Sequence, residues 1–163
     1  MSQSAIEQSV LKFSCKRLVI TGGEPLVQQK ELIPLTSSLS NKGLHCEVET
    51  NGTLTPGPEM IEAVSQWNVS PKLSNSKNYP NQREVPTALN TFSELDSAYF
   101  KFVISEPSDL SEVERLVQRY NLTPSRVILM PEGITARIVT ERGRWLANTC
   151  VSRGYRFSTR LHI

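Results

Sequence analysis

The residues best suited to hold a ligand follow short apolar runs. The first run, Leu18–Ile20, is followed by Thr21–Pro25, which reads TGGEP. Glycine has no Cβ, so a ligand can approach its backbone closely, and its carbonyl stays free to accept hydrogen bonds. Carbonyl oxygens together with the Glu24 carboxylate suit a cationic ammonium group. A phosphate would require N–H donors and a lysine instead, and no P-loop or dinucleotide-binding motif follows a predicted strand.

Polar and charged residues also follow the other apolar runs. Each such ending has a simpler interpretation, because Asn-Gly and Pro-Glu-Gly are common turn sequences. A turn by itself, however, does not require so many charged side chains at the carboxyl ends of the strands. Ser70 and Lys72 can meet hydroxyls or a carboxylate, so a ligand with an amino-acid group attached to a ribose fits. The charged residues at these ends are Glu24, Glu49, Lys72, Glu132, Arg160 and His162.

Two hydrophobic periodicities alternate along the chain and predict an α/β fold with a parallel six-stranded sheet and helical crossovers. The sheet is either open and doubly wound or an incomplete barrel. In both, ligands bind at the carboxyl ends of the strands. The predicted strands are Leu18–Thr21, His45–Thr50, Trp67–Ser70, Ala98–Ser105, Arg126–Met130 and Tyr155–Ile163.

Helical spacing and end signals place the segments between the strands. The polar run Leu73–Leu95 contains two prolines and predicts a long loop with at most a short helix. The helices are predicted at residues 5–14, from near Pro34 to Asn41, from Pro58 to Val64, after Pro107 with Ser108 or Asp109 as cap, and from Thr135 to Arg153 before Gly154.

The composition is that of a globular protein with one domain. The 163 residues carry a net charge of +2, which gives no electrostatic reason to expect nucleic acid or a membrane as a partner. No apolar run approaches the roughly 20 residues that span a bilayer, and the N-terminus has no signal-peptide pattern, so a cytoplasmic location is expected. The three cysteines, Cys15, Cys46 and Cys150, are far apart and predict neither a disulfide framework nor a zinc site.

Six short motifs, in their order and spacing, carry a family resemblance. They are TGGEPLVQ, VETNGT, SPK, KFV, LMPEG and RLHI. Together they resemble the 7-carboxy-7-deazaguanine synthase family of radical S-adenosylmethionine (SAM) enzymes. Gly-Gly-Glu-Pro alone marks the wider superfamily, and the ETNGT, SPK and MPEG stretches narrow it. The resemblance extends from about Ala5 to Ile163, so residues 1–163 are expected to form a single radical SAM-like domain, a partial radical SAM barrel.

The resemblance implies a lyase of queuosine and 7-deazapurine biosynthesis. Such enzymes convert the small molecule 6-carboxy-5,6,7,8-tetrahydropterin to 7-carboxy-7-deazaguanine with loss of ammonia. They use SAM, a [4Fe-4S] cluster and Mg²⁺, and they are homodimers with an abbreviated barrel-like fold.

The resemblance also implies roles for individual residues. Thr21, Glu49 and His162 would face the pterin substrate. No residue of this sequence is assigned as a catalytic group or a metal ligand. The residues implied in binding SAM are Gly22, Gly23, Glu24, Ser70, Lys72, Met130 and Glu132.

The cysteines depart from the family pattern. The family holds its cluster with three closely spaced cysteines between its first barrel strand and the helix before TGGEP, and this sequence has no such group. We therefore expect a chain shortened at the N-terminus, without the first strand and the cluster loop, and also shortened at the C-terminus. Such a chain would be inactive by itself and would leave one sheet edge unpaired.

Two other interpretations stay open at this point. One is another small radical SAM protein of the activating-enzyme type, against which the ETNGT, SPK and MPEG set argues. The other is a non-catalytic SAM-binding α/β module, which the absent cysteine group favours.

Overall fold

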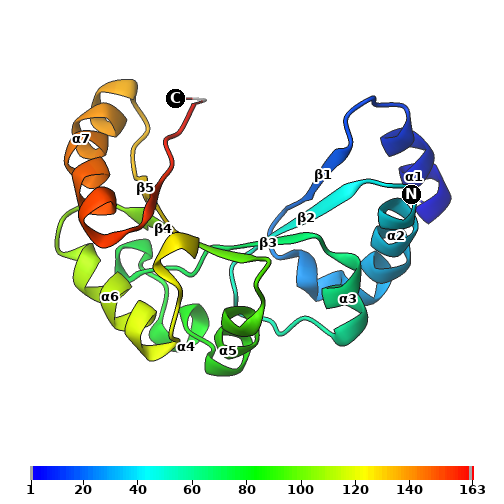
Figure 1. Ribbon diagram of the computed structural model, residues 1–163, viewed down its shortest axis with the longest axis horizontal. Helices are drawn as coiled ribbons and strands as arrows, with labels where there is room; N and C mark the ends of the chain where they lie inside the picture. Colours follow the sequence, from blue (N-terminus) through cyan, green and yellow to red (C-terminus); the bar gives the residue numbers. More distant parts are fainter. Residues whose placement is uncertain (1, 162) are drawn as a thin grey trace.

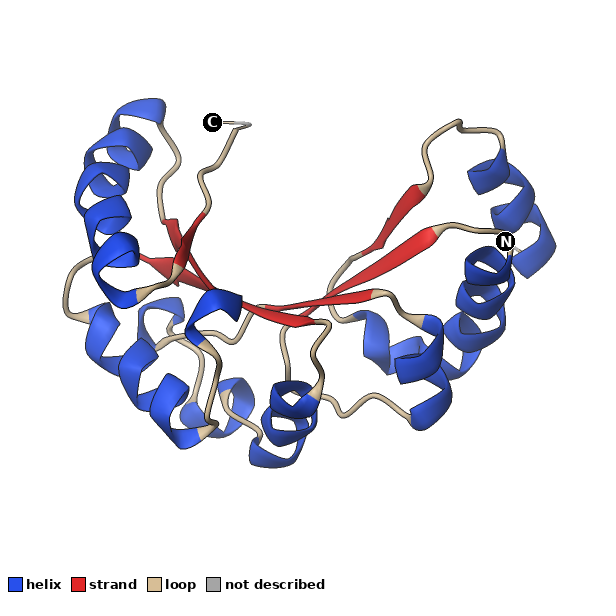
Figure 2. Cartoon of the chain, in the orientation of Figure 1, coloured by secondary structure: helices blue, strands red, loops and turns tan. Residues whose placement is uncertain are grey.

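The chain forms one curved, fully parallel sheet whose strands follow the order β1-β2-β3-β4-β5-β6. The computed structural model describes residues 2–161 and 163. The strands line an arc, the helices cover its convex side, and the concave side is open (Figure 1 and Figure 2). The architecture is therefore the incomplete barrel, one of the two arrangements that the alternating periodicities left open and the one that the family resemblance implies.

The elements alternate along the chain, as a parallel sheet with crossovers requires. The strands are β1 (Arg17–Ile20), β2 (His45–Thr50), β3 (Gln66–Val69), β4 (Ala98–Ile104), β5 (Val127–Pro131) and β6 (Arg156–Phe157). The α-helices are α1 (Gln3–Leu11), α2 (Gln29–Asn41), α3 (Pro58–Ala63), α4 (Pro80–Arg83), α5 (Pro86–Glu94), α6 (Asp109–Arg119) and α7 (Ala136–Arg153). Short 3₁₀ turns are η1 (Pro25–Gln28), η2 (Ser74–Ser76) and η3 (Pro124–Arg126).

The two faces of the sheet differ in character because side chains alternate along a strand. In β4, Phe100 and Phe102 are buried among apolar residues, while Lys101 between them is only partly buried. The same alternation in β2 buries Val48 and leaves Glu49 partly exposed. The apolar face packs under the helices, and the polar face lines the concave side.

The strand register sets which polar residues are neighbours on the concave face. Glu49 of β2 pairs with Asn68 of β3, and Asn68 pairs with Tyr99 of β4. Since all strands run in one direction, their carboxyl ends and the loops that follow them meet at one rim.

The helix α7 follows the predicted bounds. The Thr135 hydroxyl accepts a hydrogen bond from the Ile138 N–H at 3.4 Å, and Gly154 ends the helix with φ +69°. In α6 the predicted cap differs in detail. Ser108 occupies the cap position without a side-chain hydrogen bond, whereas the Asp109 carboxylate accepts from the backbone N–H groups of Ser105 and Glu106 in the preceding loop.

The start predicted for α2 is wrong. The helix begins at Gln29, so Pro34 lies inside it rather than in its first turn. Proline removes the hydrogen bond that its N–H would donate to the carbonyl four residues earlier, here Lys30. Both residues are exposed, so water can hydrogen-bond this carbonyl and the helix continues.

The prediction for Leu73–Leu95 is also incomplete. The segment contains α5, whose Ala88, Leu89 and Phe92 are buried against the sheet. These three residues have helical spacing, but the surrounding polar residues hid the pattern in the sequence. The ring of Phe92 packs 5.3 Å from that of Trp67 in β3, so the segment contributes to the core.

The last strand is much shorter than predicted, with only Arg156 and Phe157 in the ladder. The Ser158 N–H still donates to the Leu129 carbonyl at 3.0 Å. The next bond of a parallel ladder would need an N–H from Pro131, which proline lacks. The chain therefore leaves the sheet after Ser158.

The sheet edge at β1 is paired on one side. Within residues 2–161 and 163, β1 pairs with β2 and no strand lies on its other side. None of the helices in this part of the chain is long and apolar enough to cross a bilayer.

Phe102 provides a test of this core. It is fully buried, so Phe102→Ala should lower the free energy of unfolding by about 3–5 kcal/mol through lost contacts and a cavity. Phe13 is 74% exposed, and Phe13→Ala should change it by less than about 0.5 kcal/mol. Urea denaturation of both variants measures the difference, and equal effects would contradict the core described above.

Candidate functional site

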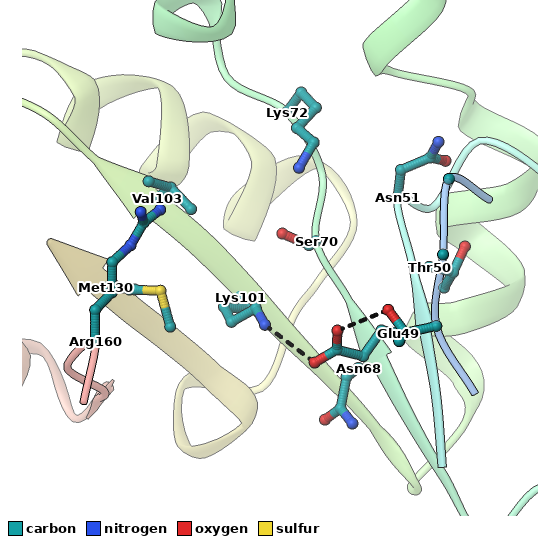
Figure 3. Close-up of a pocket in the computed structure, with 13 residues that line it drawn as sticks. Glu49, Thr50, Asn51, Asn68, Ser70, Lys72, Lys101, Val103, Met130 and Arg160 are labelled. Atoms are coloured by element: carbon teal, nitrogen blue, oxygen red, sulfur yellow. Dashed lines mark hydrogen bonds and ion pairs between the residues drawn. The ribbon is translucent and has the colours of Figure 1, made fainter. Parts of the chain in front are cut away.

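Two adjoining cavities of about 300 and 350 Å³ lie at the carboxyl ends of the strands. Figure 3 shows the first, which we call the central cavity. It is lined by Thr21, Gly22, Gly23, Glu49, Thr50, Asn51, Asn68, Ser70, Lys72, Lys101, Val103, Met130 and Arg160. The second, the side cavity, shares Ser70, Lys72, Val103 and Arg160 and adds Pro71, Leu73, Asn75, Ser76, Asn78, Ser105 and Glu132.

The two glycines of TGGEP face open space. Gly22 has φ +135°, a value that residues with a side chain rarely adopt. The backbone conformation therefore explains the glycine at this position. Gly23 has no such φ, and a Cβ built on either glycine would meet no atom within 4 Å. Since no packing inside the chain explains Gly23, the free space beside it suits a ligand that lies against the backbone.

The Glu24 carboxylate binds the end of β2 and is not among the groups that line either cavity. It accepts hydrogen bonds from the Thr50 hydroxyl at 2.9 Å, the Asn51 N–H at 2.8 Å and the Leu26 N–H at 3.1 Å. These bonds tie the loop after β1 to the loop after β2. The contacts described for Glu24 are thus structural, and its proposed contact with a cofactor amino group stays a prediction.

The Asn51-Gly52 pair is explained as a turn. Gly52 has φ +77°, and a Cβ there would lie 2.8 Å from Val69 Cγ1. The Asn51 side-chain oxygen accepts from the Thr53 N–H at 2.9 Å, as in an Asx turn. Here the simpler interpretation of the sequence is sufficient.

Glu49 is held from both sides inside the central cavity. The Thr21 hydroxyl donates to Glu49 Oε2 at 3.1 Å, and Lys101 Nζ lies 3.5 Å from Glu49 Oε1 (Figure 3). Lys101 was not predicted as a site residue. Its place in the KFV motif and the alternation of β4 were the signals that could have found it.

A carboxamide network lies beneath Glu49. Asn68 Nδ2 donates to Glu47 Oε2 at 2.9 Å, and Gln66 Nε2 donates to Asn68 Oδ1 at 2.9 Å. Arg17 Nε lies 2.8 Å from the other Glu47 oxygen. An ionised carboxylate only accepts hydrogen bonds, so Glu47 determines which way both amides face. The sequence did not predict this network, because only the strand register places these residues together.

The remaining predicted residues lie around the two cavities. Ser70, Lys72 and Met130 line the central cavity. Glu132 lines the side cavity and forms an ion pair with Arg142. The last of them, His162, falls outside the described residues.

The charge in the central cavity is unbalanced. Among the described residues that line it, Glu49 is the one carboxylate, against the cations Lys72, Lys101 and Arg160. Arg160 also donates to the Gly133 carbonyl at 3.3 Å. An excess of positive charge favours a ligand that carries at least one anionic group.

The described cysteines do not form a cluster site. Cys15 is exposed in the loop before β1, Cys46 is buried under α2, and Cys150 is buried in α7. Burial raises the pKa of the Cys46 and Cys150 thiols, which disfavours the thiolates that iron requires. Within the described part of the chain, no three His, Cys, Asp or Glu side chains come together as metal ligands. These residues therefore do not fit a [4Fe-4S] cluster.

Comparison with known proteins relates this site to a family. No family model matches the sequence. The 7-carboxy-7-deazaguanine synthase of Pyrobaculum aerophilum is 38% identical over 148 residues, which are 90% of this chain and 63% of that protein. The 7-carboxy-7-deazaguanine synthase of Hyperthermus butylicus is 31% identical, over 96% of this chain and 68% of that protein. The chain belongs to the 7-carboxy-7-deazaguanine synthase family.

Membership agrees with the resemblance of the six motifs. The chain spans about two thirds of the length of these relatives, 63% of the Pyrobaculum protein. The fold is also that of Streptococcus suis SuiB in a crystal structure with bound S-adenosylmethionine, with a TM-score of 0.64 at 13% identity over 98% of this chain and 44% of SuiB.

Glu24→Gln tests the tie between the two loops. An amide nitrogen cannot accept, so at least one donor among Thr50, Asn51 and Leu26 loses its partner. The free energy of unfolding should fall by about 1–3 kcal/mol. Glu62 is exposed on α3, and Glu62→Gln is the matched control, expected to change little. Denaturant titration compares them, and an unchanged Glu24→Gln would show that the tie contributes nothing to stability.

Proposed function

We propose that this chain carries the cofactor and substrate cavities of a radical SAM lyase. The proposed reaction converts 6-carboxy-5,6,7,8-tetrahydropterin to 7-carboxy-7-deazaguanine in the biosynthesis of queuosine and other 7-deazapurines. The observation that supports it most is that motifs far apart in a chain of this family meet at one pair of cavities. The motif residues that meet there are Thr21, Gly22, Gly23, Glu49, Ser70, Lys72, Lys101, Met130, Glu132 and Arg160.

The cofactor in this proposal lies across both cavities. The backbone carbonyl oxygens of Gly22 and Gly23 would accept hydrogen bonds from the methionine amino group of SAM. The open space beside Gly23 supports this placement. Ser70 and Lys72 would meet the ribose and the carboxylate, and they line both cavities. Met130 and Glu132 would lie near the adenine. In the complete enzyme of this proposal, one-electron reduction of SAM by the cluster would supply the 5′-deoxyadenosyl radical that takes a hydrogen atom from the substrate.

The pterin in this proposal lies in the central cavity over Glu49. The N–H groups of a pterin ring are donors, and the Glu49 carboxylate is an acceptor beside the Thr21 hydroxyl. His162 would approach from the end of the chain. Lys72 and Arg160 can pair with the carboxylates of the substrate and the cofactor, whereas Lys101 is paired with Glu49.

The cluster, Mg²⁺ and a homodimeric assembly belong to the proposal on the family resemblance alone, and a cytoplasmic location belongs to it on the sequence pattern. The described cysteines do not fit the cluster, so we propose that this chain by itself binds small molecules without turning them over.

The first test is SAM binding by isothermal titration calorimetry. Gly23→Ala places a methyl group in the ligand space and should weaken SAM binding by about tenfold or more, which corresponds to roughly 1.4 kcal/mol. Its thermal stability should stay unchanged, because the Cβ meets no atom within 4 Å. SAM binding that survives this substitution would contradict the placement of the amino group.

Gly52→Ala is the matched control for the glycine motif. Its φ of +77° and its approach to Val69 predict a loss of stability of about 1 kcal/mol or more. If Gly23→Ala lowers only SAM affinity and Gly52→Ala lowers the melting temperature, Gly23 belongs to the ligand surface and Gly52 to the turn.

The second test is anaerobic reconstitution of this chain with iron and sulfide. Because no three ligand side chains come together within the described residues, we expect no stoichiometric [4Fe-4S] absorption spectrum and no cleavage of SAM after reduction. A stoichiometric cluster with cofactor cleavage would overturn the proposal that the chain alone is inactive.

A further inference from the structure

Lys101 is the cation nearest to Glu49. Its side chain projects from β4 onto the concave face and crosses over β3 toward β2 (Figure 3). The Nζ atom lies 3.5 Å from Glu49 Oε1, and 25% of the side chain is exposed. Lys101 is the one ion-pair partner of Glu49 among the described residues.

Glu49 keeps acceptor capacity after these contacts. A carboxylate has two oxygens with two lone pairs each. The Thr21 hydroxyl occupies one position on Oε2, and Lys101 faces Oε1. Each oxygen therefore retains one free acceptor position, and two such neighbouring positions match two adjacent N–H donors.

We propose that Lys101 is a positioning residue that orients and charge-balances Glu49 for an uncharged ring edge with two adjacent N–H donors. A ring with an amino group next to a ring N–H, such as a 2-amino-4-oxo heterocycle, has this edge. The inference rests on the proposed function and deepens it, since it names the residue that makes Glu49 favour the uncharged edge of the substrate ring.

The charge of Lys101 decides which ligand Glu49 prefers. A ligand that fills the cavity removes water from the carboxylate, and a desolvated, unpaired charge is costly. With Lys101 beside it, the carboxylate already has a counter-charge and can accept hydrogen bonds from a neutral ring. Without Lys101, Glu49 would lose its ion-pair partner among the described residues, and covering its charge with a neutral ring would cost more.

The other cations of the cavity do not replace Lys101. Arg160 donates to the Gly133 carbonyl and lines the side cavity as well. Lys72 follows β3 and also lines both cavities. Neither forms an ion pair with Glu49 in the part of the chain that the structure describes.

The experiment titrates this chain with 6-carboxypterin, followed by its fluorescence, and separately with SAM by calorimetry. Lys101→Met removes the charge and keeps most of the length, and it should weaken 6-carboxypterin binding by about tenfold or more because Glu49 loses its counter-charge. Lys101→Arg should keep the affinity for 6-carboxypterin within about threefold of the native value, since the charge is retained. SAM affinity should stay within about twofold, since Lys101 is not among the proposed cofactor contacts.

A second ligand separates positioning from general damage. 6-Carboxylumazine has an oxygen in place of the 2-amino group and so lacks one of the two donors. The native chain should prefer 6-carboxypterin by about tenfold, and Lys101→Met should reduce this preference. Lys30→Met on the exposed side of α2 is the matched control and should leave both affinities and the preference unchanged. Lys101→Gln is the second neutral variant if Lys101→Met does not fold.

The outcomes distinguish this inference from the proposed function. If the native chain binds SAM but not 6-carboxypterin, both the pterin part of the proposed function and the role of Lys101 are overturned. If the native chain binds 6-carboxypterin and a neutral Lys101 variant keeps both affinity and preference, Lys101 has no positioning role and the proposed function stands. Equal losses of SAM and pterin binding would show a structural role and also overturn the inference.

Discussion

The parallel register of the six strands is the constraint on which the rest of the structure depends. Side chains alternate between the faces of a strand, so one register assigns Phe100 and Phe102 to the core and Lys101 to the concave side. A slip of one residue would bury a lysine and expose two phenylalanines. The same register pairs Glu49 with Asn68 and brings all the carboxyl ends to one rim, where the ligand cavities lie.

The glycine-rich motifs divide into two physical classes. Gly52 is required by the fold, because φ is positive and Val69 leaves no room for a Cβ. Gly133 is similar, since a Cβ there would lie 2.9 Å from Val139 Cγ2. Gly23 has space and an ordinary φ, so its lack of a side chain has no packing cause within the chain. A glycine motif can therefore combine folding and binding requirements, and only the geometry separates them.

Charge in the site is organised in two layers on the concave face. The lower layer is the Glu47 carboxylate with the amides of Gln66 and Asn68 and the guanidinium of Arg17. The upper layer is Glu49 with the Thr21 hydroxyl and Lys101. Hydrogen bonds in the lower layer leave few free donors beneath the cavity, so recognition of a ligand depends mainly on the upper layer and the rim.

The sequence by itself determined the fold class, the alternation of strands and helices along the chain and the bounds of β2 and of most of α7, because hydrophobic periodicity and end signals act locally. It also pointed to the residues at the strand ends, most of which line the two cavities, and to the family.

The sequence missed the start of α2, where solvent exposure lets Pro34 lie inside the helix, and the helix α5, whose apolar face was masked by polar neighbours. It overestimated β6, since the ladder stops where Pro131 on the neighbouring strand lacks an N–H. Only the tertiary structure placed Lys101 beside Glu49 and turned the Glu24 carboxylate toward Thr50, because contacts between residues 26 to 52 positions apart depend on the register of separate strands rather than on any local pattern.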